Sequence, residues 1–129
     1  MKLKALFLTV LATMAAPILA AKPRPLATYT LPSACPGIKT DGEITDGSGC
    51  LVLMVTFHGK RPSNAATDKA LRAYLTEALK RFSSQDILVT GWLRKTPKSS
   101  SYDDDQIYPY PKSANLVYTA KTKKIGFIN

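Results

Sequence analysis

Residues 70–82 decide the fold of this chain, and they read Ala-Leu-Arg-Ala-Tyr-Leu-Thr-Glu-Ala-Leu-Lys-Arg-Phe. The apolar side chains recur every three or four residues, so a helix would gather them in one stripe. The stripe comprises Ala70, Leu71, Tyr74, Leu75, Ala78, Leu79 and Phe82. A helix with a single apolar stripe has to bury it against another element, and we expect that element to be a sheet.

The flanking residues predict where this helix begins and ends. Ser63 or Asn64 can cap its first turn by accepting a backbone N–H hydrogen bond, and Asp68 suits the positive end of the helix dipole. Lys80 and Arg81 suit its last turn, where cations are favoured.

Runs of β-branched and apolar residues on both sides of the helix predict strands. We expect them at 28–31, 51–57, 86–93, 116–120 and 125–128. The residues between Cys35 and Cys50 are rich in Gly, Asp, Ser and Thr, so we interpret them as a turn-rich loop. The sequence therefore predicts an α+β fold in the order β-β-α-β-β-β, with one helix packed on a mainly antiparallel sheet of about four to five strands.

The first residues have the pattern of a secretory signal peptide. Lys2 and Lys4 precede an apolar run over residues 5–15, and small residues close the segment at Ala20 and Ala21. The run is shorter than the roughly 20 apolar residues that a spanning helix needs. We expect a signal peptide at 1–21, an extended segment at 22–27 and a single α+β domain at 28–129, in a periplasmic or secreted protein with no transmembrane segment after removal of the leader.

Cys35 and Cys50 are the two cysteines of the chain. An exported chain with one pair of cysteines favours a disulfide, because its compartment is oxidising. On the loop-entropy model, such a bond would stabilise the fold by about 3 kcal/mol.

The chain is basic, with 18 Lys and Arg against 9 Asp and Glu. Such a balance favours anionic partners, such as lipid headgroups, cell-wall carboxylates or nucleic acid. The bases are scattered as short pairs, however, which solubility explains equally well.

His58 is the only histidine, and it is followed by Lys60, Arg61 and Ser63 shortly before the helix. A helix N-terminus attracts anions through its free N–H groups and its dipole, so these four residues are a candidate anion-binding site. The alternative is a strand-end histidine beside two solvated bases.

A second candidate surface is the aromatic and proline-rich stretch around Tyr108 and Tyr110. The prolines stiffen this stretch, and the two rings could present a binding platform. They could equally cover a sheet edge.

Catalytic and metal-binding patterns are weak. Asp41, Glu43 and Asp46 do not match a calcium loop, which has a glutamate where this chain has Val52. We expect no metal and no cofactor. The best enzyme hypothesis is a ribonuclease-like protein, with His58 as acid and Glu43 or Glu77 as base.

Taken together, these patterns favour a small exported, non-enzymatic binding or accessory protein of the bacterial envelope, for instance an inhibitor. Its expected partner is a protein or an anionic envelope component, with nucleic acid less favoured. The alternative is a small basic secreted hydrolase that acts on phosphodiesters through His58.

Overall fold

A computed structural model describes residues 24–31, 36–96, 106–107 and 114–128. In chain order the elements are β1 (Ala27–Tyr29), β2 (Lys39–Asp46), β3 (Leu51–His58), α2 (Asn64–Phe82), β4 (Ile87–Arg94), β5 (Asn115–Thr119) and β6 (Lys124–Phe127). The predicted α+β class, with one helix on a sheet, is confirmed within these residues.

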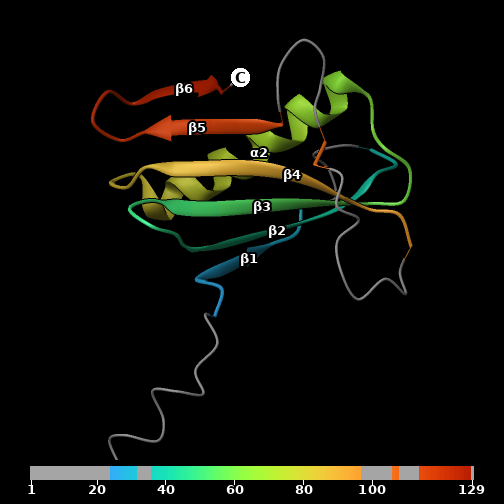
Figure 1. The fold of residues 1–129 in the computed structure, drawn as a ribbon, viewed down its shortest axis with the longest axis horizontal. Coiled ribbons are helices and arrows are strands. Elements are labelled where there is room, and N and C mark those ends of the chain that lie inside the picture. Colours follow the sequence, from blue (N-terminus) through green and yellow to red (C-terminus); the bar gives the residue numbers. More distant parts are fainter. Residues whose placement is uncertain (1–23, 32–35, 97–105, 108–113, 129) are drawn as a thin grey trace, which may run out of the picture.

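The strands form one six-stranded sheet in the order in which they occur along the chain (Figure 1). All neighbouring strands are antiparallel except β3 and β4, which are parallel. A parallel pair needs a crossover connection, and α2 provides it. The sheet is therefore mixed, and it has more strands than the four to five we expected.

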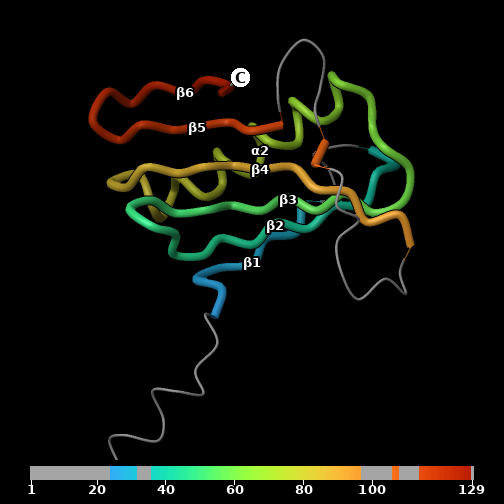
Figure 2. The backbone as a smooth tube through the Cα atoms, in the orientation of Figure 1, coloured from blue at the N-terminus to red at the C-terminus, as the bar shows by residue number. Residues whose placement is uncertain are grey.

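α2 lies behind the sheet and covers one of its faces (Figures 1 and 2). Within the described residues, no helix or strand covers the opposite face, which we call the open face. The side chain of Ser63 accepts a hydrogen bond from the N–H of Ala66 at 3.2 Å, and Lys80 and Arg81 lie in the last turn, so the predicted ends of the helix are confirmed. Asp68 lies beyond the first turn and pairs with Arg72 at 2.9 Å.

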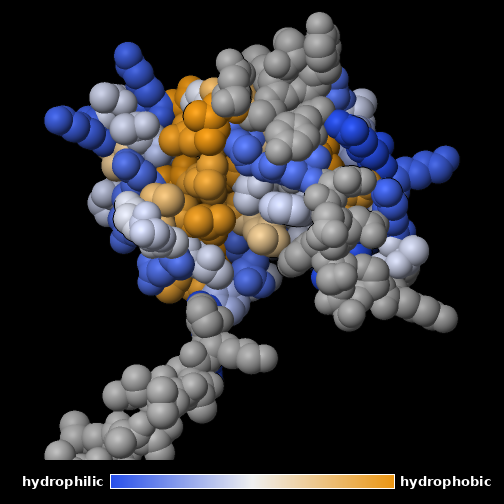
Figure 3. Space-filling model, in the orientation of Figure 1, coloured by the Kyte–Doolittle hydropathy of each residue, from blue (hydrophilic) through white to orange (hydrophobic). Residues whose placement is uncertain are grey.

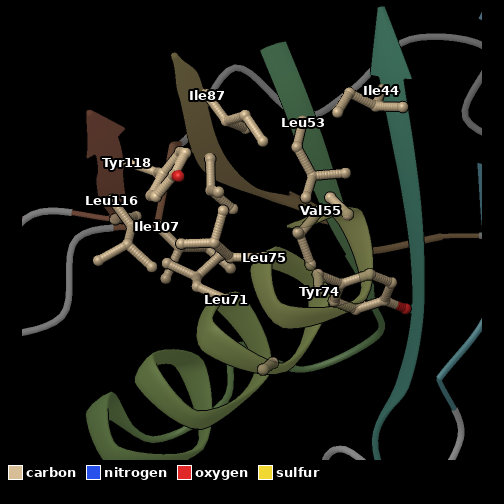
Figure 4. Packing of buried hydrophobic residues seen from close by; sticks show 14 of the residues in the cluster. Ile44, Leu53, Val55, Leu71, Tyr74, Leu75, Ile87, Ile107, Leu116 and Tyr118 are labelled. Atoms are coloured by element: carbon tan, nitrogen blue, oxygen red, sulfur yellow. The ribbon is translucent and has the colours of Figure 1, made fainter. Parts of the chain in front are cut away.

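The core lies between α2 and the sheet. Figure 4 shows Leu71, Tyr74 and Leu75 of the helix beside inward-facing residues of the strands. The fully buried strand residues include Ile44, Leu53, Val55, Ile87, Val89 and Leu116. The predicted stripe is therefore the buried face of the helix over most of its length, while Leu79 and Phe82 are only partly buried.

The segment that we interpreted as a turn-rich loop contains an eight-residue strand, β2. Its residues alternate in burial, with Thr40, Gly42 and Ile44 buried on the side of α2. All eight residues pair with β3. This long pairing with a strongly apolar strand outweighs the weak strand propensity of Gly and Asp.

The structure does not contain the predicted disulfide, because Cys50 is a free thiol. Cys50 directly precedes Leu51, at the end of β2 where Asp46 pairs with Leu51, whereas Cys35 precedes Lys39 at the other end. The two ends of β2 are about 23 Å apart at the usual rise of a strand. Cys50 therefore lies about that far from Lys39, and Cys35 itself is outside the described residues.

Candidate functional site

His58 ends β3 on the open face, in a row of basic residues. The register places Lys39 of β2 and Arg94 of β4 directly beside it on the two neighbouring strands. The row exists because β3 pairs in antiparallel fashion with β2 and in parallel with β4. Three side chains with donor groups therefore lie next to one another at one end of the sheet.

Asp41 fixes the orientation of the His58 ring. The Nε2 atom of His58 lies 2.6 Å from a carboxylate oxygen of Asp41, and the two side chains are 23% and 46% exposed. An ionised carboxylate can only accept a hydrogen bond, so Nε2 carries the proton and Nδ1 is left to contact a ligand.

Asp41, His58 and Arg94 line a pocket of about 220 Å³ on the open face, and Lys39 lies outside its lining. Thr56 is only 6% exposed and lines the pocket, and its partners on the neighbouring strands are Asp41 and Trp92. The complete lining is Thr28, Asp41, Gly42, Glu43, Met54, Thr56, His58 and Arg94. The lining is mostly polar and the volume is below the usual range for drug-sized ligands, so the pocket suits one small polar group.

Lys60, Arg61 and Ser63, which we grouped with His58, do not line this pocket. Lys60 and Arg61 line a separate pocket with Gly59, Leu93 and Lys95. The hydroxyl of Ser63 accepts a hydrogen bond from the N–H of Ala66 and so caps the helix.

The two carboxylates proposed as bases lie on opposite sides of the sheet. Glu43 is on β2 and lines the pocket with His58. Glu77 is on α2, which covers the other face, and pairs with Lys80 at 2.8 Å. Glu43 therefore remains a candidate partner of His58, whereas Glu77 does not.

Two groups of predicted residues cannot be placed. Tyr108, Tyr110 and Cys35 lie outside the described residues, as does the predicted signal peptide. Among the residues that are described, no three His, Cys, Asp or Glu side chains gather in a way that could hold a metal ion. The same part of the chain contains no helix that is long and apolar enough to cross a membrane.

Our reading of the sequence missed Asp41, Thr56 and Arg94 as site residues. The signal was present in β2, where Asp41 and Glu43 alternate with the buried Thr40, Gly42 and Ile44. Alternation of this kind marks a strand with one polar face, but the glycines favoured a loop.

Comparison of the chain with protein-family models, with curated proteins and with solved structures found no match.

Proposed function

We propose that this protein is an exported binding protein that holds a phosphate-bearing component of the envelope in the pocket on its open face. The observation that carries the proposal is the position of His58, oriented by Asp41 and set between Lys39 and Arg94. Arginine and lysine are the usual partners of phosphate oxygens, since they combine positive charge with several donors.

The rest of the lining narrows the class of ligand. Thr28 and Thr56 add hydroxyl groups, which can donate to phosphate oxygens. Glu43 would repel a bare phosphate, but it would accept a hydrogen bond from a hydroxyl or an amine. A ligand that carries such a group next to its phosphate, such as glycerol phosphate or a sugar phosphate, satisfies both requirements.

Charge around the pocket supports an anion. Lys39, Lys60, Arg61 and Lys95 lie at the same end of the sheet as His58 and Arg94. Asp41 and Glu43 are the only acidic residues in the lining of the pocket. A basic surrounding raises the local concentration of anions and speeds their association.

Calorimetric titration with glycerol 3-phosphate tests this proposal. We expect Arg94→Gln to weaken binding by about tenfold or more, because it removes a charge-assisted, forked donor. Arg72→Gln is the matched control, since it makes the same change of charge on α2, behind the sheet. Equal effects of the two substitutions, or no binding by the unaltered protein, would show that the pocket is not the site.

A second candidate, cleavage of a phosphodiester, is favoured by the placement of His58 and Glu43 in one pocket. Their backbones are about 13 Å apart along the strands, since Glu43 pairs with Met54, four residues before His58. Two side chains that approach a ligand from opposite ends are suited to act as base and acid.

In RNA, Glu43 would take the proton of the ribose 2′-hydroxyl, and the freed oxygen would attack phosphorus. The bond from phosphorus to the 5′-oxygen would break, and protonated His58 would give its Nδ1 proton to the departing oxygen. Purified protein should then cleave RNA, and His58→Ala and Glu43→Gln should each abolish cleavage. Binding of glycerol 3-phosphate without cleavage of RNA would exclude the hydrolase and support the binding proposal.

A further inference from the structure

A row of apolar side chains crosses the open face next to the pocket. The register aligns Val52, Leu88 and Val117 on three adjacent strands. Leu26 lies on the same line at the β1 edge, beyond the polar Thr45 of β2, which pairs with Val52. The N–H of Leu26 bonds to the carbonyl of Ile44, and its side chain is 42% exposed. Figure 3 shows a hydrophobic band that crosses the strands in this region. We call these four residues the apolar row.

The apolar row and the pocket are two halves of one surface. Along β3 the side chains on the open face are Val52, Met54, Thr56 and His58, and they change in this order from apolar to ionisable. β4 changes in the same direction, from Leu88 to Arg94. Met54 lines the pocket and is the next residue on this face after Val52, so it joins the two halves.

The dimensions of the apolar row favour a single hydrocarbon chain. Leu26 and Val117 are separated by four strand spacings, or about 19 Å. Val52, where the row adjoins the pocket, lies midway between them, so a chain that starts in the pocket has about 10 Å of row in either direction. This is shorter than the roughly 15 Å of hydrocarbon in one leaflet of a bilayer, so the row suits a short chain or part of a longer one. The row is only one side chain wide, far less than the roughly 800 Å² per partner that a stable protein interface buries.

We infer that the open face binds one molecule of an anionic amphiphile, with its phosphate headgroup in the pocket and its hydrocarbon chain on the apolar row. This inference rests on the proposed binding of phosphate. Charge complementarity sets the direction of the molecule, because the basic residues lie at the pocket end of the face. Val52, Leu88 and Val117 are half-buried, so they fit a chain that lies on the surface and do not project into a bilayer.

Titration with monoalkyl phosphates of increasing chain length, each kept below its micelle-forming concentration, tests the inference. We expect affinity to rise from methyl to dodecyl phosphate by about twofold to fourfold for each added methylene, as burial of hydrocarbon predicts. The same series with a trimethylammonium headgroup should bind at least about tenfold more weakly, because the pocket end is basic.

Substitutions separate the row from other exposed apolar residues. Leu88→Ser together with Val117→Ser should flatten the dependence on chain length and leave the affinity for methyl phosphate unchanged. Ile125→Ser is the matched control, since Ile125 is 43% exposed on β6 and its strand partner is Tyr118, on the helix side of the sheet. Circular dichroism checks that each variant is folded. The chain-length series on the unaltered protein tests the inference even if a variant fails to fold.

The possible outcomes distinguish this inference from the proposed binding of phosphate, on which it rests. Binding of methyl phosphate with no gain from longer chains would overturn the amphiphile and keep phosphate binding. Failure of every phosphate to bind would overturn both. Binding only to vesicles of anionic lipid, or dimerisation that is lost in the double variant, would also overturn the inference, because each requires an occupant other than a single chain.

Discussion

Gly42 shows how one residue connects the core to the site. It lines the pocket on one face of β2, and on the other face a Cβ atom in its place would lie 2.4 Å from the ring of Tyr74. Tyr74 is fully buried, and its hydroxyl shares a 2.8 Å hydrogen bond with that of Thr40. The ring of a helix residue therefore supports the floor of the pocket from below.

Gly42→Ala should lower the free energy of unfolding by about 1–3 kcal/mol, because the methyl group has no space without moving Tyr74. Urea denaturation followed by circular dichroism measures this change. The matched control is Gly126→Ala, where a Cβ would meet nothing within 4 Å, and we expect a change below about 0.5 kcal/mol. A Gly42→Ala protein as stable as the original would contradict this packing.

At the scale of elements, the helix was predictable and β2 was not. The 3.6-residue periodicity of α2 is a local property of the sequence, and so is the cap at Ser63. β2 depends instead on its partners, since its strand propensity is low and its register is fixed by pairing along its whole length with β3 and over three residues with β1.

The candidate site was only partly predictable for the same reason. His58 is conspicuous as the only histidine of the chain, and Glu43 was already a candidate. Arg94 is beside His58 only because β3 and β4 are parallel, and no local pattern encodes a pairing across an intervening helix. Asp41 was read as part of a turn, so its bond to His58 could not be foreseen.

Substitutions at Ser63 can distinguish a role in helix capping from a role in ligand binding. Ser63→Ala should cost about 1 kcal/mol of stability, because the N–H of Ala66 loses its partner. Ser63→Asp should restore most of that loss, since aspartate caps equally well. Affinity for glycerol 3-phosphate should remain unchanged in Ser63→Ala, and a clear loss of affinity with unaltered stability would return Ser63 to the binding site.

At the scale of the whole molecule, the fold consists of two antiparallel three-stranded units, β1–β3 and β4–β6, joined by α2 and by the parallel pair at the centre. One side of the sheet is committed to the core. The other is uncovered by helices or strands within the described residues, and it divides into a polar pocket and an apolar row. The predicted class of fold anticipated the first side but not the second, which depends on the register of all six strands.

The free thiol of Cys50 gives a prediction for the stability of the whole fold. The midpoint of thermal unfolding should be the same with and without reductant, because no bond between Cys35 and Cys50 is present to be broken. Cys50→Ser should behave in the same way. A lower midpoint in reductant, seen only in the protein with both cysteines, would show that the two cysteines are bonded and would contradict the free thiol.

The order of the strands has a mechanical consequence. β1 and β6 are the two edges of the sheet, so the chain leaves the fold from opposite edges. A force that pulls the two ends of the chain apart acts across the strands. It therefore strains the hydrogen bonds of an edge strand, β1 or β6, before those of the inner strands. The sheet should therefore come apart strand by strand under low force. An attachment at the N-terminal end would load β1, and an attachment at the C-terminal end would load β6, on the opposite edge.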